Sequence, residues 1–178
     1  MTRRELEVTD REEILHILDT AKVVHLGLVD DGMPYVLPMN YGYVMDEDGK
    51  LSIYLHSANN GYKLDVIRKN PAACFEMDCD VAPFEGKVAC QYGITYYSLI
   101  GRGKAVIVED AEEKCRAMSL LMQAQTGKAF EFNERLVMVC TVIRIDVDTY
   151  TAKHRPLPCD ALPAEPKADG TMPHVMSF

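Results

Sequence analysis

The sequence lacks several features that would place it in common classes of protein. Basic residues are in the minority, with 19 Lys and Arg against 27 Asp and Glu and a formal net charge of −8. Without a basic face, nucleic acid is not expected as a partner. No apolar run approaches the length of a signal-peptide core or a membrane span, and the opening segment MTRRELEVTDREE is charged from its third residue. We therefore expect a cytoplasmic protein that binds neither nucleic acid nor a membrane.

The six cysteines form no CxxC pair. In a reducing compartment this spacing predicts free thiols rather than a disulfide framework. Cys74, Cys79 and Cys90 lie within one stretch of sequence, but no histidine is near them at ligand spacing. The sequence therefore predicts no metal site.

Two nucleotide-binding motifs are present only in part. The segment GRGKAV begins at Gly101 but lacks the third glycine of the dinucleotide fingerprint, and it lies within a strand pattern. The segment QTGK resembles the end of a P-loop, yet the glycine required five residues before Gly127 is Met122. Neither a Rossmann domain nor a P-loop is expected.

The order of patterns predicts one mainly β domain over residues 1–155. A capping box from Thr9 to Glu12 opens a helix. β-Rich runs from Val23 to His56, interrupted by Asp-Asp-Gly and Asp-Glu-Asp-Gly, predict a three-stranded antiparallel meander. In its first strand, alternation puts one apolar set on a single face: Val24, Leu26 and Leu28.

The rest of the chain adds two helices and further strands. We predict helices over about 60–69 and 110–127, a strand over 72–80, a less regular stretch over 81–92, and long strands over 93–110 and 135–153. About six antiparallel strands with three peripheral helices favour a small barrel over a parallel α/β sheet. The proline-rich tail over 156–178 has no periodicity, so we expect it to be disordered or laid over a surface.

One stretch has the features of an anion site. The strand that ends in His56, Ser57 and Ala58 is followed by Asn-Asn-Gly and a helix that carries Lys63 in its first turn and Arg68 and Lys69 in its last. Free backbone N–H groups, the Ser57 hydroxyl and the Lys63 ammonium can all point at one anion. A solvated helix with ordinary surface lysines explains the same residues equally well.

A second candidate is the segment YVLPMNYGY. Pro38 cannot donate to a β ladder, so this strand lies at an edge or bends, and neighbouring backbone groups stay available to a planar ring. Judged on physics alone, a plain edge strand is the simpler explanation. In YGITYYSLI, alternation separates Tyr96 and Ser98 from Tyr97, so only one set can face a ligand.

Four segments catch the eye together: HSANNGYKLDVIRKNPAACFEM, PYVLPMNYGY, YYSLIGRGKAVIVEDAEEK and IRIDVDTYTAKHRP. In this combination the sequence resembles the split-barrel flavoproteins of the pyridoxamine-phosphate-oxidase-like superfamily, in particular the branch of nitroimidazole-resistance proteins. The resemblance covers about residues 10 to 155. It implies a six-stranded antiparallel split barrel that forms a homodimer, with one FMN in each of two clefts between the chains.

The resemblance also assigns residues to the cofactor. The backbone around Pro38, Met39 and Asn40 is expected to meet the flavin ring. The ribityl phosphate is expected to lie among four residues of the anion site: His56, Ser57, Ala58 and Lys63. The partner chain is expected to add Tyr97 and Ser98. At Tyr97, relatives often carry an arginine, and the basic run Lys153-His154-Arg155 offers a replacement cation or is simply a charged strand end.

The resemblance implies an FMN-dependent oxidoreductase in which a nicotinamide donor, NAD(P)H, supplies electrons to a small molecule such as a nitroaromatic compound. His56 is the residue we can name as a proton donor. True pyridoxamine-phosphate oxidase activity is less favoured, because Arg155 is the only arginine near the C-terminus. Two other classes stay open: a non-catalytic haem or flavin binder, with His25, His56 and His154 as candidate haem ligands, and a structural dimer with an empty cleft.

Overall fold

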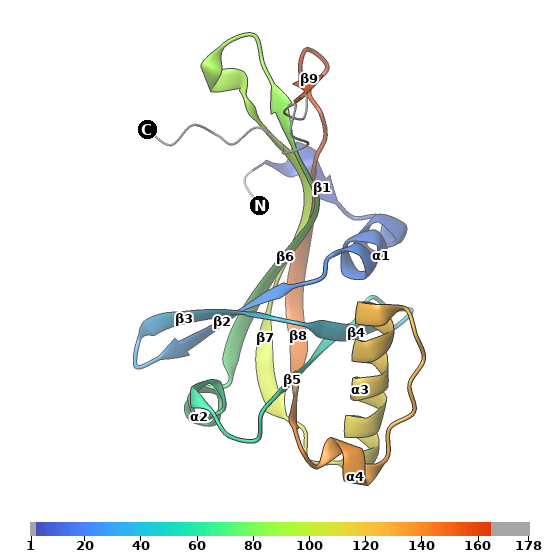
Figure 1. The fold of residues 1–178 in the computed structure, drawn as a ribbon. Coiled ribbons are helices and arrows are strands. Elements are labelled where there is room, and N and C mark those ends of the chain that lie inside the picture. The colour runs from blue at the N-terminus through green and yellow to red at the C-terminus, as the bar shows by residue number, and fades with distance from the viewer. Residues whose placement is uncertain (1–2, 165–178) are drawn as a thin grey trace, which may run out of the picture.

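A computed structural model describes residues 3–164 of the chain (Figure 1). Its strands are β1 (Glu7–Val8), β2 (Val24–Asp30), β3 (Met33–Met39), β4 (Tyr41–Met45), β5 (Leu51–Ser57), β6 (Ala72–Glu85), β7 (Gly93–Ile107), β8 (Thr141–Arg155) and β9 (Leu162–Pro163). Its α-helices are α1 (Arg11–Thr20), α2 (Tyr62–Lys69), α3 (Ala111–Thr126) and α4 (Glu134–Val137). Short 3₁₀ turns occupy Arg4–Leu6 and Ala89–Gln91.

The strands form one antiparallel sheet in the order β3-β2-β6-β7-β8-β5-β4, and β1 and β9 are added to β8 and β6. The two ends of this order, β3 and β4, follow each other in the chain through Asn40. The sheet must therefore curl until its edges approach, although no ladder between β3 and β4 closes it. The predicted mainly β split barrel is confirmed, with nine strands and four α-helices within residues 3–164 where six and three were expected.

The predicted three-stranded meander is wrong. β2 and β3 form one hairpin and β4 and β5 form another, whereas β3 and β4 lie at opposite edges of the sheet. The chain leaves the β3 ladder after Met39, one residue past Pro38, which lies on an edge strand as predicted. Because proline has no N–H to donate, it is tolerated on such an edge strand, and the chain crosses to the other edge of the sheet through Asn40.

Three predicted boundaries also differ. The N-cap of α1 is Asp10 and not Thr9, because the Asp10 carboxylate accepts from the amides of Glu12 and Glu13 at 2.9 and 3.1 Å. Strand β6 continues to Glu85, into the first part of the stretch over 81–92 that we expected to be less regular. The segment predicted as the start of the last strand forms α4 instead, capped by the Asn133 side chain.

The interior of the barrel holds one apolar cluster. The predicted inward face of β2 is buried, and matching positions on the other strands meet it: Val24, Leu26, Leu28, Leu51, Ile53, Leu55, Phe75, Met77, Leu99, Ile143 and Ile145. Helix α1 covers one part of the barrel, α2 lies against β2 and β7, and α3 lies along β4 and β5 (Figure 1). Within residues 3–164, no helix has both the length and the apolar character needed to cross a membrane. Residues 165–178 of the predicted tail lie outside the described residues.

Candidate functional site

The turn between β5 and α2 leaves a helix N-terminus without a side-chain cap. The N-cap residue is Gly61, whose φ of 151° lies outside the range that L-residues readily adopt. Among residues 3–164, no side chain accepts a hydrogen bond from the first amides of α2. The N–H groups of Tyr62 and Lys63 are therefore placed as an anion site would need them.

Of the three predicted cations on α2, two are paired with a carboxylate and one has no carboxylate partner in the described part of the chain. Arg68 pairs with Asp65 at 2.9 Å on the helix surface, and Lys69 pairs with Asp30 at 3.3 Å. Lys63 is half-buried in the first turn and has no ion pair or hydrogen bond among residues 3–164. The structure therefore narrows the predicted basic cluster to Lys63.

The same turn is fixed in place from two sides. Asn59 donates from Nδ2 to the carbonyl of Met138 at 2.9 Å and accepts from the Thr141 hydroxyl at 3.1 Å. On the other side, the hydroxyl of Tyr62 donates to the carboxylate of Asp30 on β2. Sequence reasoning treated Asn59 only as a turn residue, because its two partners lie about eighty residues further along the chain.

His56 and Ser57 leave β5 on opposite faces, as alternation requires. Ser57 is buried at the end of the barrel, and its hydroxyl donates to the carbonyl of Ala58 at 2.8 Å. His56 is half-buried, and its Nδ1 is the one buried side-chain nitrogen or oxygen in the described part of the chain that has no hydrogen-bond partner. A buried polar atom without a hydrogen-bond partner costs about 1–3 kcal/mol of folding free energy. A ligand that hydrogen-bonds to Nδ1 of His56 would remove this cost.

The backbone predicted to meet a flavin ring lies at an edge of the sheet. Pro38 and Met39 pair with His25 and Val24 on one side only, because β3 is the last strand in the sheet order. The Asn40 side chain is already engaged, since its Nδ2 donates to Gln125 of α3 at 3.0 Å. The free backbone of β3, rather than the Asn40 amide, is thus available to a planar ring.

The register brings the β3 end close to the β5 end within one chain. Tyr41 pairs with Leu55, so the residues just before Tyr41 lie beside those just after Leu55. Asn40, at the end of the Pro38–Asn40 segment, therefore lies next to His56, at the start of the His56–Ala58 segment.

Tyr97 and Ser98 lie far from this point in the same chain. Ser57 pairs with Thr141, and two residues further along β8, Ile143 pairs with Ile107 of β7. Tyr97 precedes Ile107 by ten residues, which on a strand at about 3.3 Å per residue is roughly 30 Å. One chain does not bring Tyr97 and His56 to a common ligand.

Tyr97 is held against α1 and the end of β8. Its hydroxyl donates to Glu13 at 3.2 Å, and its ring stacks on His154 with centroids 3.8 Å apart. The neighbouring cations are also occupied, since Lys153 donates to the Tyr96 hydroxyl at 2.7 Å and Arg155 lies over the ring of Phe84. The candidate haem ligand His25 is exposed on β2, with Nδ1 3.2 Å from Glu76.

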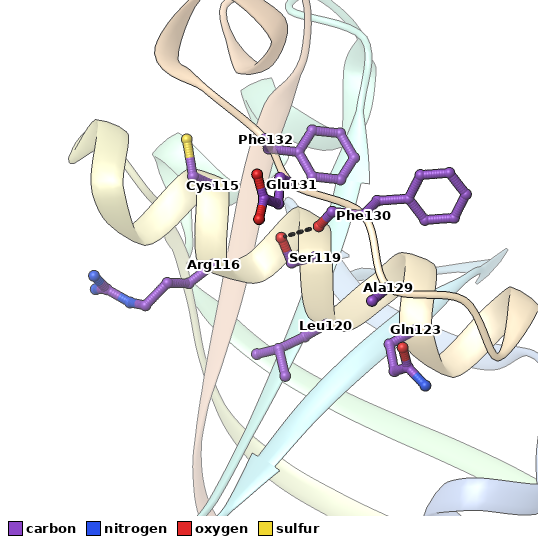
Figure 2. A pocket seen from close by; sticks show the side chains of 9 residues that line it. All are labelled: Cys115, Arg116, Ser119, Leu120, Gln123, Ala129, Phe130, Glu131 and Phe132. Atoms are coloured by element: carbon purple, nitrogen blue, oxygen red, sulfur yellow. Dashed lines mark hydrogen bonds between the residues drawn. The ribbon is translucent and has the colours of Figure 1, made fainter.

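A shallow groove of about 640 Å³ lies elsewhere, between α3 and the following loop (Figure 2). Phe130 and Phe132 stand above the helix, and the Ser119 hydroxyl donates to the Phe130 carbonyl at 2.8 Å. None of the predicted cofactor residues lines this groove.

Two features of the fold define a distinct class of β protein. The sheet is an antiparallel split barrel whose chain crosses from one edge to the other, and a helix N-terminus lies beside that crossing. The family model of pyridoxamine 5'-phosphate oxidase matches residues 10–154. The chain belongs to this family, as the sequence resemblance predicted. A search of curated proteins finds no match.

Several solved structures share the fold. A candidate 5-nitroimidazole antibiotic resistance protein from Bacteroides thetaiotaomicron is 30% identical, with a TM-score of 0.71 over 84% of this chain and 86% of that chain. The FAD and heme binding protein from Mycobacterium smegmatis is 16% identical, with a TM-score of 0.72 over 88% of this chain and 83% of that chain. The flavocytochrome Anf3 from Azotobacter vinelandii is also 16% identical, with a TM-score of 0.71 over 100% of this chain and 84% of that chain.

Proposed function

We propose that the protein binds FMN in a cleft between two copies of the chain and reduces a small molecule with electrons from NAD(P)H. The observation that carries the proposal is the uncapped N-terminus of α2 with Lys63 beside it, in a member of the pyridoxamine 5'-phosphate oxidase family. The likeness to a candidate nitroimidazole-resistance protein favours a nitroaromatic compound as the substrate class.

The residues at the β5–α2 turn fit a phosphate. Lys63 supplies a positive charge that no carboxylate of the described chain neutralises, and the amides of Tyr62 and Lys63 supply donors. Arg68 and Lys69 contribute little, because each already faces an aspartate. Asn59 holds the turn in position through its bonds to Met138 and Thr141.

The edge of β3 suits the ring of the cofactor. Its unpaired backbone N–H and C=O groups between Pro38 and Asn40 are able to form hydrogen bonds with the polar edge of a planar ring, as they would with a neighbouring strand. When bound, FMN supplies the two-electron redox chemistry. The chain orients the ring, neutralises the phosphate and positions His56, whose imidazole is able to deliver a proton to the substrate.

A second chain completes the site in this proposal. Tyr97 and Ser98 are about 30 Å along the sheet from the β5–α2 turn of their own chain, so their contribution has to come from a partner. The face of the sheet that carries Ser98 also has exposed apolar residues suited to a protein contact, among them Ile100 on β7 and, three strands away, Val36 on β3, which are 50% and 63% exposed.

The first experiment is an absorbance spectrum of the purified protein, followed by titration of the flavin-free protein with FMN. We expect a flavin spectrum and tight binding by the wild type. Lys63→Ala should weaken binding by about ten- to a hundredfold, since a charge-assisted contact contributes about 1.5–3 kcal/mol. Lys69→Ala is the matched control, because it removes an equal charge from the same helix but one that Asp30 already faces.

The outcomes separate the alternatives. Failure of the wild type to bind FMN overturns the proposal, and equal losses in Lys63→Ala and Lys69→Ala would show that only overall charge matters. A Soret band in place of flavin absorbance would favour the second candidate, a haem binder, which the likeness to a FAD and heme binding protein supports. His25→Ala, His56→Ala and His154→Ala would then identify the axial ligand. NAD(P)H oxidation with a nitroaromatic acceptor tests the reductase activity itself.

A further inference from the structure

Three potential metal ligands from distant parts of the sequence meet where α1 crosses β6. His16 lies on α1, and Cys79 and Asp80 lie on β6. Nε2 of His16 is 2.6 Å from Oδ2 of Asp80, and all three ligand atoms, including Sγ of Cys79, lie within 4.8 Å of one another. Sequence patterns did not indicate this group, because more than sixty residues separate the histidine from the other two.

An irregularity in β6 makes the meeting possible. Successive residues of a regular strand face opposite sides of the sheet, so Cys79 and Asp80 would normally point apart. Here the register shifts between Cys79 and Ala82, so that two residues of β6 lie opposite one residue of β7. Asp80 takes a left-handed φ of 53°, and this β-bulge turns its carboxylate toward α1. The Thr95 hydroxyl fixes the bulge by donating to the carbonyls of Asp80 and Ala82.

The imidazole is also held in a suitable orientation. Nδ1 of His16 lies 3.4 Å from the Thr20 hydroxyl, one turn further along α1, while Nε2 faces Asp80. The ring of Tyr97 packs edge-on against the imidazole at a centroid distance of 5.4 Å. In metal sites the second ring nitrogen of a histidine ligand commonly has such a partner, which fixes the ring and its tautomer.

We propose that His16, Cys79 and Asp80 form a binding site for a zinc-like divalent cation, next to Tyr97, which each chain contributes to its partner's proposed flavin cleft. One imidazole, one thiolate and one carboxylate form a ligand set that Zn²⁺ accepts and that Mg²⁺ and Ca²⁺ do not prefer. Zinc lies about 2.0–2.3 Å from such atoms, so small movements of the side chains bring all three into its shell. Three protein ligands leave a fourth position for water.

Access and burial agree with this assignment. The side chains of His16 and Asp80 are 45% and 49% exposed, so an ion reaches them from solvent. Cys79 is 6% exposed and lies behind them, which places the sulfur on the inner side of the site. A bound ion would clamp α1 onto β6. The alternative is a surface ion pair between His16 and Asp80, with Cys79 serving only as a core residue; it predicts no sulfur-to-metal contact.

The test is a titration of the purified full chain with Co²⁺, recorded as difference spectra so that flavin absorbance cancels. We expect one Co²⁺ per chain, a sulfur-to-cobalt charge-transfer band, and displacement of both by Zn²⁺. Cys79→Ser should abolish the band. His16→Ala and Asp80→Asn should weaken binding at least tenfold, and because both side chains are half-exposed, these variants are expected to fold.

Cys74→Ser is the matched control, since Cys74 lies on the same strand but is exposed on the other face, opposite Gly27. Absence of the charge-transfer band in the wild type, or its survival in Cys79→Ser, overturns the proposal. FMN binding by the same variants is measured separately, so that loss of the metal site and loss of the proposed flavin site remain distinguishable.

Discussion

The hydroxyl of Tyr41 on β4 donates to the backbone carbonyl of Leu18 on α1 at 2.8 Å and also lies 3.0 Å from the carbonyl of Ala21. Tyr41 is 1% exposed. We predict that Tyr41→Phe lowers the free energy of unfolding by about 1–2 kcal/mol, because buried carbonyls at the end of α1 lose their donor. Urea denaturation measures the change. Tyr92→Phe, at an exposed tyrosine, should have no measurable effect.

The same tyrosine predicts an alkaline limit to stability. Burial raises the pKa of Tyr41 well above its usual value near 10. Below pH 10 the hydroxyl is protonated in both states and its contribution is complete. Above pH 10 the unfolded tyrosine ionises while the folded one does not, so the free energy of unfolding falls as pH rises. In Tyr41→Phe this fall should be shallower, and an equal slope in both proteins between pH 9.5 and 11 would contradict the assignment.

An ion pair between α3 and β8 offers a second stability prediction. Arg144 contacts Glu113 at 2.5 Å and Asp146 at 2.6 Å, and the Arg144 and Glu113 side chains are only 26% and 19% exposed. The Tyr54 hydroxyl also donates to Glu113. Glu113→Ala should therefore cost about 1–3 kcal/mol. Glu112→Ala, one residue away with a loose and exposed pair to Arg116, should stay within about 0.5 kcal/mol of the wild type.

The Gly61 backbone is predicted to matter for the proposed cofactor. Gly61→Ala places a Cβ at a residue whose φ is 151°, a backbone conformation that alanine rarely adopts. We expect this variant to lower the free energy of unfolding by about 1 kcal/mol or more, to shift the first amides of α2 and so to weaken FMN binding. Gly32 in the β2–β3 turn is the control, because it also has a positive φ, 84°, and open space for a Cβ. Gly32→Ala should lose stability and keep its FMN affinity. Equal FMN affinities in both variants would exclude a role for the α2 N-terminus.

The proposed dimer predicts that assembly and cofactor binding fail together. Ile100→Lys places a charge on the exposed face of β7 and should yield a monomer with little FMN affinity but an unchanged circular dichroism spectrum. Val44→Lys is the control. It changes an exposed valine on β4, an edge strand three positions from β7 in the sheet order, and this variant should remain dimeric. Light scattering coupled to size-exclusion chromatography measures the mass. A wild-type monomer that binds FMN would remove the shared cleft from the proposal.

Local patterns predicted the fold class well, and long-range relationships poorly. Alternation in β2, the stop of α3 at Gly127 and the edge position of Pro38 all follow from short-range chemistry, and all three are confirmed. The predicted meander was wrong because turn residues indicate where a strand ends. They do not indicate which strand the following segment will pair with. The roles of Asn59 and of Asp30 depend on partners that only the completed barrel brings close.

The candidate site shows the same limit. Sequence alone presented Lys63, Arg68 and Lys69 as one basic cluster, and only the positions of Asp65 and Asp30 separate them. Nothing in the sequence indicated that His16 would lie beside Cys79 and Asp80, since that meeting depends on a bulge. The assignments to FMN, to the partner chain and to His56 remain predictions.

The pairing of Ser57 with Thr141 has a consequence for biosynthesis. During translation β5 emerges long before β8, so the β5–α2 turn cannot acquire its final support, including the bonds of Asn59, until most of the chain has left the ribosome. Pairing between segments so far apart in sequence is slow to nucleate. The nascent protein should therefore become competent for its ligand only near the end of its synthesis.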